Sequence, residues 1–439
     1  MEVAERILQW VTEAGATGDL MIAEGSSLSL KARDGELEEH KVSSSQVFGI
    51  RVIKDDKAGV AYSEAADTAA LRLMVDQALV NASYARTDTN EQIPDTEITL
   101  ATDDALLAPT DDVTVEEKID AVLRLERELA ARDKVTNVPY NGVSDVTAAQ
   151  RIFSTAGLNA VSRVRACFSQ AAALVEEGDK NVMEGWGQGA RRFDELDIDH
   201  IVDTAHANCL ALLYGEAIPS GHYDVIFDTQ CQPTMFSTFS MMFSGKAAKD
   251  GINPMRDKIG EAIGDPRLDL FDSPLMDDGF GYALFDDEGS PTARTALIAG
   301  GNLETFIHNS ATAAHFGVQT TGNGARSPRS TLEVQLHQLE IGAGDADDDA
   351  VTMGEYLELT DLTGTHSGAN AVAGDFSFGA SGFLCRDGER IQPVRNITVA
   401  GNFYEMLNKI DLIGKTRRWD MNRHAFMPPI RFSDVAISG

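Results

Sequence analysis

The 439-residue chain is 43% hydrophobic, which is enough to bury a sizeable core and excludes a disordered protein. Its formal net charge of −32 argues against nucleic acid and anionic membranes as partners, because both would repel it. We expect the acidic surface to keep the protein soluble, as in a salty cytoplasm; the alternative is that its field attracts cationic peptides.

The cysteines and the first residues indicate a compartment. Cys167, Cys209, Cys231 and Cys385 lie far apart and form no CxxC pair, so we predict reduced thiols. The opening MEVAERILQW carries acids where a signal peptide needs positive charge, and no apolar run approaches the roughly 20 residues that span a bilayer. A cytoplasmic protein is therefore expected.

Residues 1–110 are predicted to form an amino-terminal α+β domain of helix, β-meander and helix. Apolar residues recur at helical spacing over 3–11, and the period then becomes two in SLSLKARDGELEEHKV. That stretch predicts a hairpin whose turn is Asp34-Gly35, because Asp-Gly supplies the positive φ of a type I′ turn. QVFGIRVI and AGVAYS, joined by a charged turn at 54–57, continue the antiparallel meander, and helical spacing returns over 71–79.

Residues 111–217 are predicted to form a middle α+β segment that packs with the first domain. Thr114 and Glu117 fit a capping box at the start of a helix. Strands are expected from about residue 134 to 190, broken by turns at Asn141-Gly142 and Ala156-Gly157. A helix from about Asp194 to Tyr214 closes the segment.

Residues 218–439 are predicted to form a β-rich carboxy-terminal domain. The sequence IPSG at 218–221 marks its boundary, and YDVIFD after it is typical of a buried strand. From about residue 265 onward the chain has short strand patterns and many glycines. The expected class is therefore α+β, with an amino-terminal α/β region that contains an antiparallel meander and a carboxy-terminal β-rich domain.

Motifs for catalysis and metal binding fail when they are tested one by one. None of the nine histidines is followed by Glu, so the chain has no H-E-x-x-H. His308 and His315 could share a helical face, but helix is plausible only after Ser310, so two separately hydrogen-bonded histidines are expected. The GASG stretch around Ser381 does not complete a nucleophile elbow, and the P-loop-like tail at Lys415 lacks its first glycine. The residues alone therefore predict no catalytic group and no metal site.

Three stretches remain as candidates for binding. Asp286, Asp287 and Glu288 precede Gly289, and carboxylates crowded in this way repel one another unless something cationic lies beside them. They either accept hydrogen bonds from a bound peptide amine or cap the following turn. QTTGNGARS and GANAVAGDFSFGASGF are rich in small residues, so they either pair with an extended peptide or form tight β-turns.

These stretches, in this order and spacing, resemble the TldD/PmbA family. The resemblance is carried by FDDEGSPTARTALIAGGNLETFIHNSATAAHFG, TTGNGARSP, GANAVAGDFSFGASGFLCRDGERIQPV and TVAGNFYEML. FGIRVIKDDKAGVAYS and GEAIPSGHYDVIFD fit as well, so it covers nearly the whole chain. The family has two branches that pair with each other. In the TldD branch, which resembles a metallopeptidase, a helix after the junction strand carries H-E-x-x-x-H and a downstream cysteine completes the metal site.

The corresponding helix of this chain is expected near 231–249, CQPTMFSTFSMMFSGKAAK, which contains neither histidine nor glutamate. Hydroxyls, thioethers and phenyl rings cannot hold zinc or activate its water, and Cys385 cannot form a site without histidine partners. The chain therefore resembles the other branch, PmbA, also called TldE. That branch implies a cytosolic heterodimer in which a TldD-type subunit holds the zinc, while this chain binds no cofactor.

The implied function is that of a metal-free subunit in a metallopeptidase that matures or degrades unfolded or leader peptides. On this interpretation, seven residues shape the partner interface and a groove for an extended peptide, by β-augmentation, and perform no hydrolysis. They are Asp287, Glu288, Gly289, Asn323, Gly374, Asp375 and Ser377. Two alternatives stay open: an independent metallohydrolase whose site is assembled from scattered His, Asp and Cys residues, and a peptide-binding regulatory homodimer.

Overall fold

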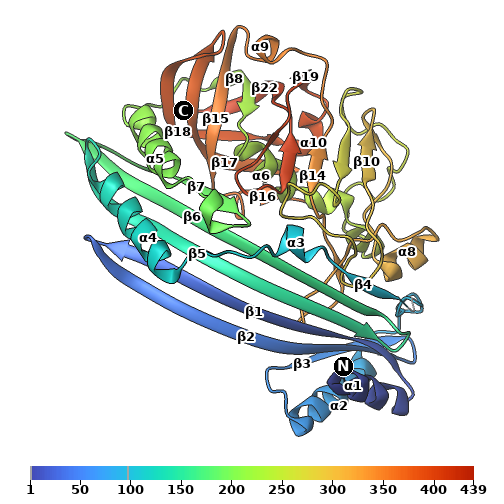
Figure 1. Ribbon diagram of the computed structural model, residues 1–439. Coiled ribbons are helices and arrows are strands. Elements are labelled where there is room, and N and C mark those ends of the chain that lie inside the picture. The colour runs from blue at the N-terminus through green and yellow to red at the C-terminus, as the bar shows by residue number, and fades with distance from the viewer. Residues whose placement is uncertain (1, 96–97) are drawn as a thin grey trace.

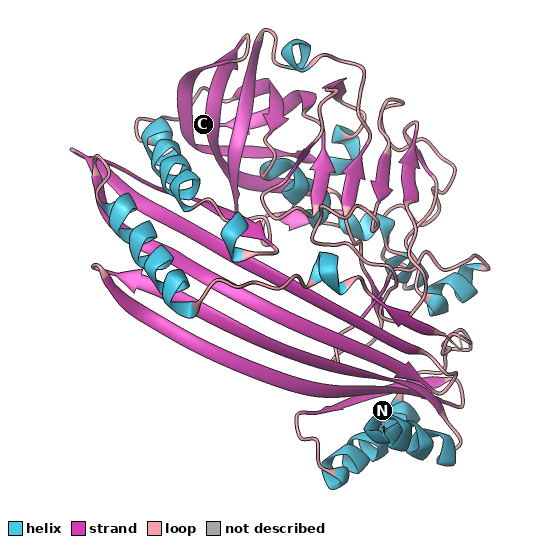
Figure 2. Ribbon diagram, viewed as in Figure 1, coloured by secondary structure: helices cyan, strands magenta, loops and turns pink. Residues whose placement is uncertain are grey.

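A long curved sheet in the amino-terminal half lies beside a β-rich body formed by the carboxy-terminal half (Figure 1). The computed structural model describes residues 2–95 and 98–439. Strands outweigh helices in both halves (Figure 2). The α+β class predicted from the sequence is therefore confirmed. None of the described helices combines the length and apolar character needed to cross a bilayer.

The amino-terminal sheet unites the first two predicted segments. Its strands are β1 (Thr17–Arg33), β2 (Glu36–Lys54), β3 (Lys57–Ser63), β4 (Thr99–Ala101), β5 (Val135–Ser154), β6 (Asn159–Glu177) and β7 (Lys180–Ala190). They follow the order β3-β2-β1-β5-β6-β4, and β7 also pairs with β6. Every pairing is antiparallel except that of β4 with β6. Because β1 pairs with β5, residues 1–110 and 111–217 contribute to one sheet.

The tight turns of this sheet test the predicted hairpins. Asp34 and Gly35 have φ of 53° and 77°, so the Asp-Gly turn between β1 and β2 is confirmed. The charged turn before β3 is confirmed by Asp55 and Asp56, which also have positive φ. The turn at Ala156-Gly157 joins β5 to β6 and is confirmed as well.

The turn predicted at Asn141-Gly142 is wrong, because both residues lie inside β5. Asn141 is buried, and its side chain accepts a hydrogen bond from the Ala32 N–H and donates one to the Ala32 carbonyl, both at 2.9 Å. The amide thus extends the β1–β5 pairing beyond its last backbone partners, Leu30 and Val143. Because the Asn141 side chain forms its hydrogen bonds across the strands, the backbone continues through β5 without a turn.

Helices cover both ends of the curved sheet (Figure 1). They are α1 (Glu2–Glu13), α2 (Thr68–Tyr84), α3 (Asp104–Leu107), α4 (Val115–Ala130), the 3-10 turn η1 (Phe193–Glu195) and α5 (Ile198–Leu212). At one end, α1 and α2 bury Ile7, Val11 and Val75 against β1 and β2. At the other end, α4 begins with the predicted Thr114–Glu117 capping box, which is confirmed.

Helix α5 joins the two halves of the molecule, and it confirms the helix expected to close the middle segment. Its apolar face, with Ile201, Ala205 and Cys209, belongs to one buried cluster with strands β6 and β7. The same cluster includes Tyr356 and Phe383 of the carboxy-terminal half. The two halves therefore share a continuous core at this end.

A closed barrel forms the centre of the carboxy-terminal half. Its sheet contains β8 (Gly221–Phe227), β15 (Glu355–Thr363), β16 (Ala369–Asn370), β17 (Asp375–Arg386), β18 (Glu389–Asn402), β19 (Ile410–Ile413) and β22 (Ile430–Ser438). The order is β15-β8-β22-β18-β17-β16, β19 pairs with β22, and β15 also pairs with β17. That last pairing closes five strands into a ring, which leaves them no free edge within it. The strand expected after residues 218–221 is present as β8.

A second, six-stranded sheet flanks the barrel. It consists of β9 (Leu270–Asp272), β10 (Thr295–Ala299), β11 (Asn302–Leu303), β14 (Leu339–Ile341), β20 (Arg418–Trp419) and β21 (Ala425–Met427). β12 (Gly324–Ala325) and β13 (Glu333–Val334) form a separate two-stranded ribbon. The short helical elements are α6 (Cys231–Thr238), η2 (Ser240–Phe243), α7 (Gly245–Lys249), α8 (Ser310–Phe316), α9 (Asp348–Val351) and α10 (Phe403–Met406).

The helix expected near 231–249 is present in that region but is broken into three pieces. The first break is at Phe239, whose ring stacks on Phe403 at a centroid distance of 4.7 Å in the core. A second break comes at Ser244, which leaves the helical conformation and caps α7 by accepting the Ala247 N–H. Packing of the phenyl ring and the serine cap both favour short helices over one long helix.

Candidate functional site

Two adjoining cavities lie between the amino-terminal sheet and the carboxy-terminal half. One has a volume of about 960 Å³ and is lined from β7, α5, the end of β8 and β15. The other has a volume of about 910 Å³ and is lined from β5, β6, α6 and the loop at 281–287. We call them the acidic cavity and the α6 cleft. They share Gln230, Pro233, Asp420 and Ala425, so they adjoin in one recess, and each cavity has the size of a ligand site.

Helix α6 forms one wall of the cleft where the family resemblance expects chemistry. It presents Pro233, Thr234 and Ser237, and the following turn adds Ser240 and Met241. The Thr234 hydroxyl donates to the Gln230 carbonyl at 3.1 Å, and the Ser237 hydroxyl donates to the Thr234 carbonyl at 3.1 Å. These hydroxyls are engaged within the helix, so the wall offers a surface for binding and no ligand set for zinc.

Asp286 and Asp287 of the acidic triplet also line the α6 cleft, and Asp286 organises the turn that follows. Asp286 is 3% exposed, and its carboxylate accepts the N–H groups of Glu288 and Ser290 at 2.9 Å and of Gly324 at 2.7 Å. Burial and the adjacent Glu288 carboxylate raise the pKa of Asp286 to about 8, against these three donors. For this residue, the capping alternative matches the structure.

Asp287 and Glu288 tie the cleft to the amino-terminal sheet. Asp287 lines the cleft and accepts hydrogen bonds from Gln150 at 2.6 Å and from the Arg326 N–H at 2.8 Å. Glu288 is 2% exposed and accepts from Ser310 at 2.6 and 2.8 Å and from Arg51 at 3.1 Å. The cationic partner that the crowded carboxylates require is thus supplied within the chain.

Arg51 is the centre of a buried charge network between the two halves. Two of its guanidinium nitrogens contact Asp19 at 2.5 and 2.9 Å, and Arg326 pairs with the other oxygen of Asp19. Coulombic attraction by Asp19 and Glu288 outweighs burial and raises the pKa of Arg51. For Arg326, burial and the neighbouring Arg51 lower the pKa. Sequence reasoning missed this network, because its members lie more than 30 positions apart and follow no local pattern.

Gly289 and Asn323 fix the backbone behind the cleft. Gly289 has a φ of 78°, and a Cβ at this position would lie 2.6 Å from Leu158 of the amino-terminal sheet. Asn323 is 1% exposed and donates to Asp272 at 2.6 Å and to the Gln335 carbonyl at 2.8 Å. Neither residue lines the cleft directly, so both act on its shape.

The remaining predicted groove residues are not brought to this recess. Gly374, Asp375 and Ser377 lie at the start of β17, where Asp375 accepts a hydrogen bond from Asn402 at 2.9 Å. Gly374 has a φ of 87° and lies where a Cβ would approach the Tyr404 ring. None of the three lines either cavity. These three residues therefore lie outside the recess that Asp287 lines.

The histidines that were candidates for a metal pair are separate. His308 precedes α8, is buried, and lies 3.2 Å from the Thr312 hydroxyl through Nδ1. Burial lowers its pKa to about 4. His315 lies on α8 and is exposed, with its ring edge-on to Phe316.

Among the described residues, the one group of three metal-ligating side chains within 4.8 Å is Asp111, Asp145 and Cys167. Lys118 lies 3.0 and 2.5 Å from the two carboxylates, and Arg165 lies 2.7 and 2.6 Å from them. Burial and Asp145 raise the pKa of the Cys167 thiol to about 12. Two cations and a protonated thiol make this a salt-bridge cluster, which disfavours a metal site built from scattered residues.

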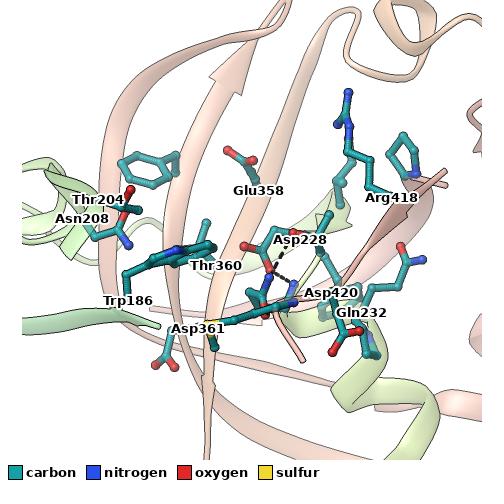
Figure 3. Close-up of a pocket in the computed structure, with 18 of the residues that line it drawn as sticks. Trp186, Thr204, Asn208, Asp228, Gln232, Glu358, Thr360, Asp361, Arg418 and Asp420 are labelled. Atoms are coloured by element: carbon teal, nitrogen blue, oxygen red, sulfur yellow. Dashed lines mark hydrogen bonds between the residues drawn. The ribbon is translucent and has the colours of Figure 1, made fainter. Parts of the chain in front are cut away.

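The acidic cavity contains functional candidates that sequence reasoning did not find (Figure 3). Glu184 comes from β7, Asp228 follows β8, and Glu358 and Asp361 come from β15. Burial raises the pKa of Glu184 to about 7 and that of Asp228 to about 6, and it also raises the pKa of Asp361. These acids are far apart in the chain, so no local sequence motif predicts that they share one cavity.

Known proteins and protein-family models match most of the length of the chain. Models of the PmbA/TldA metallopeptidase domains match residues 18–82 (domain 1), 108–213 (central domain) and 220–439 (C-terminal domain). The chain is 25% identical to the metalloprotease PmbA of Escherichia coli O157:H7, over 94% of this chain and 90% of that protein. It is 23% identical to a metalloprotease TldD homolog of Haemophilus influenzae, over 88% of this chain and 83% of that protein.

A solved structure shares the fold. TldE from Thermococcus kodakarensis superposes with a TM-score of 0.84 at 20% sequence identity, over 100% of both chains. The family predicted from the sequence is confirmed by the three domain matches.

Proposed function

The chain belongs to the PmbA/TldD family of metallopeptidases, and on this premise we propose that it is the subunit without a catalytic metal in a heterodimeric peptidase. In this role it holds extended or unfolded peptides in the recess between its two halves. A TldD-type partner supplies the zinc and performs the hydrolysis. The peptides would be unfolded chains or leader segments that are matured or degraded.

One observation carries the proposal: the chemistry of the α6 wall. This helix follows the junction strand β8 and faces the cleft, yet it presents proline, threonine and serine. Zinc in a hydrolytic site needs imidazole, carboxylate or thiolate ligands and a base that activates water. The residues present do not fit a zinc ion, so the hydrolytic step is assigned to the partner. The match to a protein named PmbA over most of the chain supports the same branch.

The buried network around Asp287 and Glu288 supports a holding role. Asp287 and Glu288 accept hydrogen bonds from groups on both halves of the molecule, so the width of the cleft is fixed. A fixed cleft binds an extended chain with less loss of conformational freedom than a flexible one. The cysteines are unsuited to act as nucleophiles, because burial raises the pKa of the Cys209, Cys231 and Cys385 thiols and keeps them protonated.

Reconstitution with the partner tests the proposal. The purified chain, a TldD-type subunit from the same organism, and their mixture are each incubated with an unfolded peptide, with and without a chelator. We expect rapid, chelator-sensitive cleavage by the mixture and a stable complex by size-exclusion chromatography. A chain that remains a homodimer beside its partner, with no gain in cleavage, would favour a regulatory homodimer instead.

A further inference from the structure

The acidic cavity has an excess of carboxylates that the rest of the chain does not neutralise. Seven acids line it, against two arginines, Arg390 and Arg418. Arg390 pairs with Glu358 at 2.7 Å, and Arg418 lies 3.7 Å from Asp348. Among the described residues, Glu184, Asp228 and Asp361 have no cation within salt-bridge distance. Three partly buried carboxylates in one recess therefore lack a positive partner.

A buried amide in the same wall lacks a donor. Gln232 lines the cavity and is 3% exposed. Its nitrogen donates to the Pro428 carbonyl at 3.1 Å, while its Oε1 accepts no hydrogen bond from the described residues. A buried acceptor without a partner destabilises the fold, so an N–H group brought by a ligand would be stabilised here. This acceptor is independent of the carboxylates and requires the same kind of ligand, one rich in donors.

The spacing of the acids excludes a single small metal ion as the best occupant. Glu184, Asp228 and Asp361 do not meet the spacing of three ligating atoms within 4.8 Å that the described residues show at Asp111, Asp145 and Cys167. Acceptors that are spread around a cavity of about 960 Å³ suit an extended cation. A guanidinium has five N–H donors in a plane and can serve several acceptors at once.

The cavity also offers an aromatic wall and a strand backbone. Trp186 and Thr360 line the same recess as the acidic side chains (Figure 3), and the indole face of Trp186 can stack on a guanidinium. The neighbouring residues Gly185 and Gly187 line the same cavity from β7, which among the described residues has β6 as its strand partner.

We propose that the acidic cavity binds an arginine side chain of the peptide substrate, with Glu184, Asp228 and Asp361 as charge partners, the Gln232 oxygen as an acceptor and Trp186 as a stacking surface. The proposal rests on the proposed function, since it names the class of peptide that the subunit holds. Free guanidinium compounds share this chemistry, and the peptide is the occupant to which the proposal commits, because the cavity opens into the α6 cleft through Gln230 and Pro233.

The test measures peptide binding to the purified full-length chain by fluorescence anisotropy. The probe is a labelled peptide of alanine and serine with one central arginine. Matched peptides carry citrulline, lysine or glutamate at that position, and arginine amide is the competitor. Citrulline has the shape of arginine without its charge. We expect the arginine peptide to bind about tenfold more tightly than the citrulline peptide, with lysine between them, and arginine amide to compete only weakly.

Variants distinguish binding in the acidic cavity from attraction by the overall negative charge of the protein. Glu184→Gln and Asp361→Asn should each bring the affinity for the arginine peptide close to that for the citrulline peptide, which should not change. Glu405→Gln removes the same charge from an exposed residue outside both cavities and should have no effect. Thermal melting of each variant verifies folding, and the paired variants keep the test decisive if one of them unfolds.

Four outcomes would overturn the proposal. Equal affinity for the arginine and citrulline peptides would show that the cavity is not a cation site, and it would leave the proposed function intact. An equal loss of affinity for the arginine peptide in Glu405→Gln would show that the preference for arginine comes from the net charge of the protein. Arginine amide that binds as tightly as the peptide would make the cavity a small-molecule site. If no peptide of any composition bound, the proposed function would fail together with this inference.

Discussion

The buried pairing of Glu288 gives a stability prediction whose size follows from the structure. Both carboxylate oxygens are occupied: one by Arg51 at 3.1 Å and the Ser310 hydroxyl at 2.6 Å, the other by the Ser310 N–H at 2.8 Å. Glu288→Gln keeps the size of the side chain, removes the charge, and turns an amide N–H₂ toward donors. Removing one partner of a buried ion pair costs about 3–5 kcal/mol. Because Arg51 keeps Asp19, we expect a loss near the lower limit, about 3 kcal/mol.

Guanidinium unfolding followed by circular dichroism measures this loss. Glu304→Gln is the matched control, since it makes the same chemical change at an exposed residue and should alter the free energy of unfolding by at most about 0.5 kcal/mol. A double-mutant cycle with Ser310→Ala should reveal coupling of roughly 1 kcal/mol or more. A cost of Glu288→Gln that matches the control would refute the role of this residue in joining the two halves.

Three further changes test other parts of the account. The pKa of Glu184 is raised to about 7 because burial and Asp361 outweigh Arg395, so the folded state holds a proton that the unfolded state releases at lower pH. The wild type should therefore lose roughly 1–3 kcal/mol relative to Glu184→Gln as pH rises from about 4.5 to 7, and a constant difference across that range would contradict this. Gly289→Ala should destabilise more than Gly354→Ala, since both have positive φ but only Gly289 would place a Cβ 2.6 Å from another side chain; equal losses in thermal melting would show that the close approach is unimportant. Finally, a net charge of −32 should make the melting temperature rise from low salt to about 1 M salt, and an unchanged value would remove the link to a salty habitat.

The fold was largely predictable where the signal was local. The Asp34-Gly35 turn, the Thr114 capping box and the buried strand at 221–227 each follow from a few neighbouring residues. The Asn141-Gly142 turn failed because the same dipeptide can serve a strand when its amide bonds to a distant strand, here at Ala32. Local patterns do not contain that information.

The site was predictable only in part, for the same reason. Asp287, one of the predicted groove residues, lines the α6 cleft, but the sequence could not show that Glu288 is buried against Arg51. The acids of the acidic cavity were missed because β7 and β15 bring Glu184 and Asp361 together from distant parts of the chain. Long-range pairing of strands decides which side chains meet.

The central claim is that this chain holds peptide and does not hydrolyse it, and zinc binding by the purified chain tests it most directly. The chain is dialysed against excess zinc and then against buffer, bound zinc is measured by mass spectrometry, and the same sample is assayed for peptide cleavage. The account predicts far less than one tightly bound ion per chain and no cleavage until a TldD-type subunit is added, because α6 provides no zinc ligands. About one retained zinc ion per chain, together with cleavage by the chain alone, would contradict it.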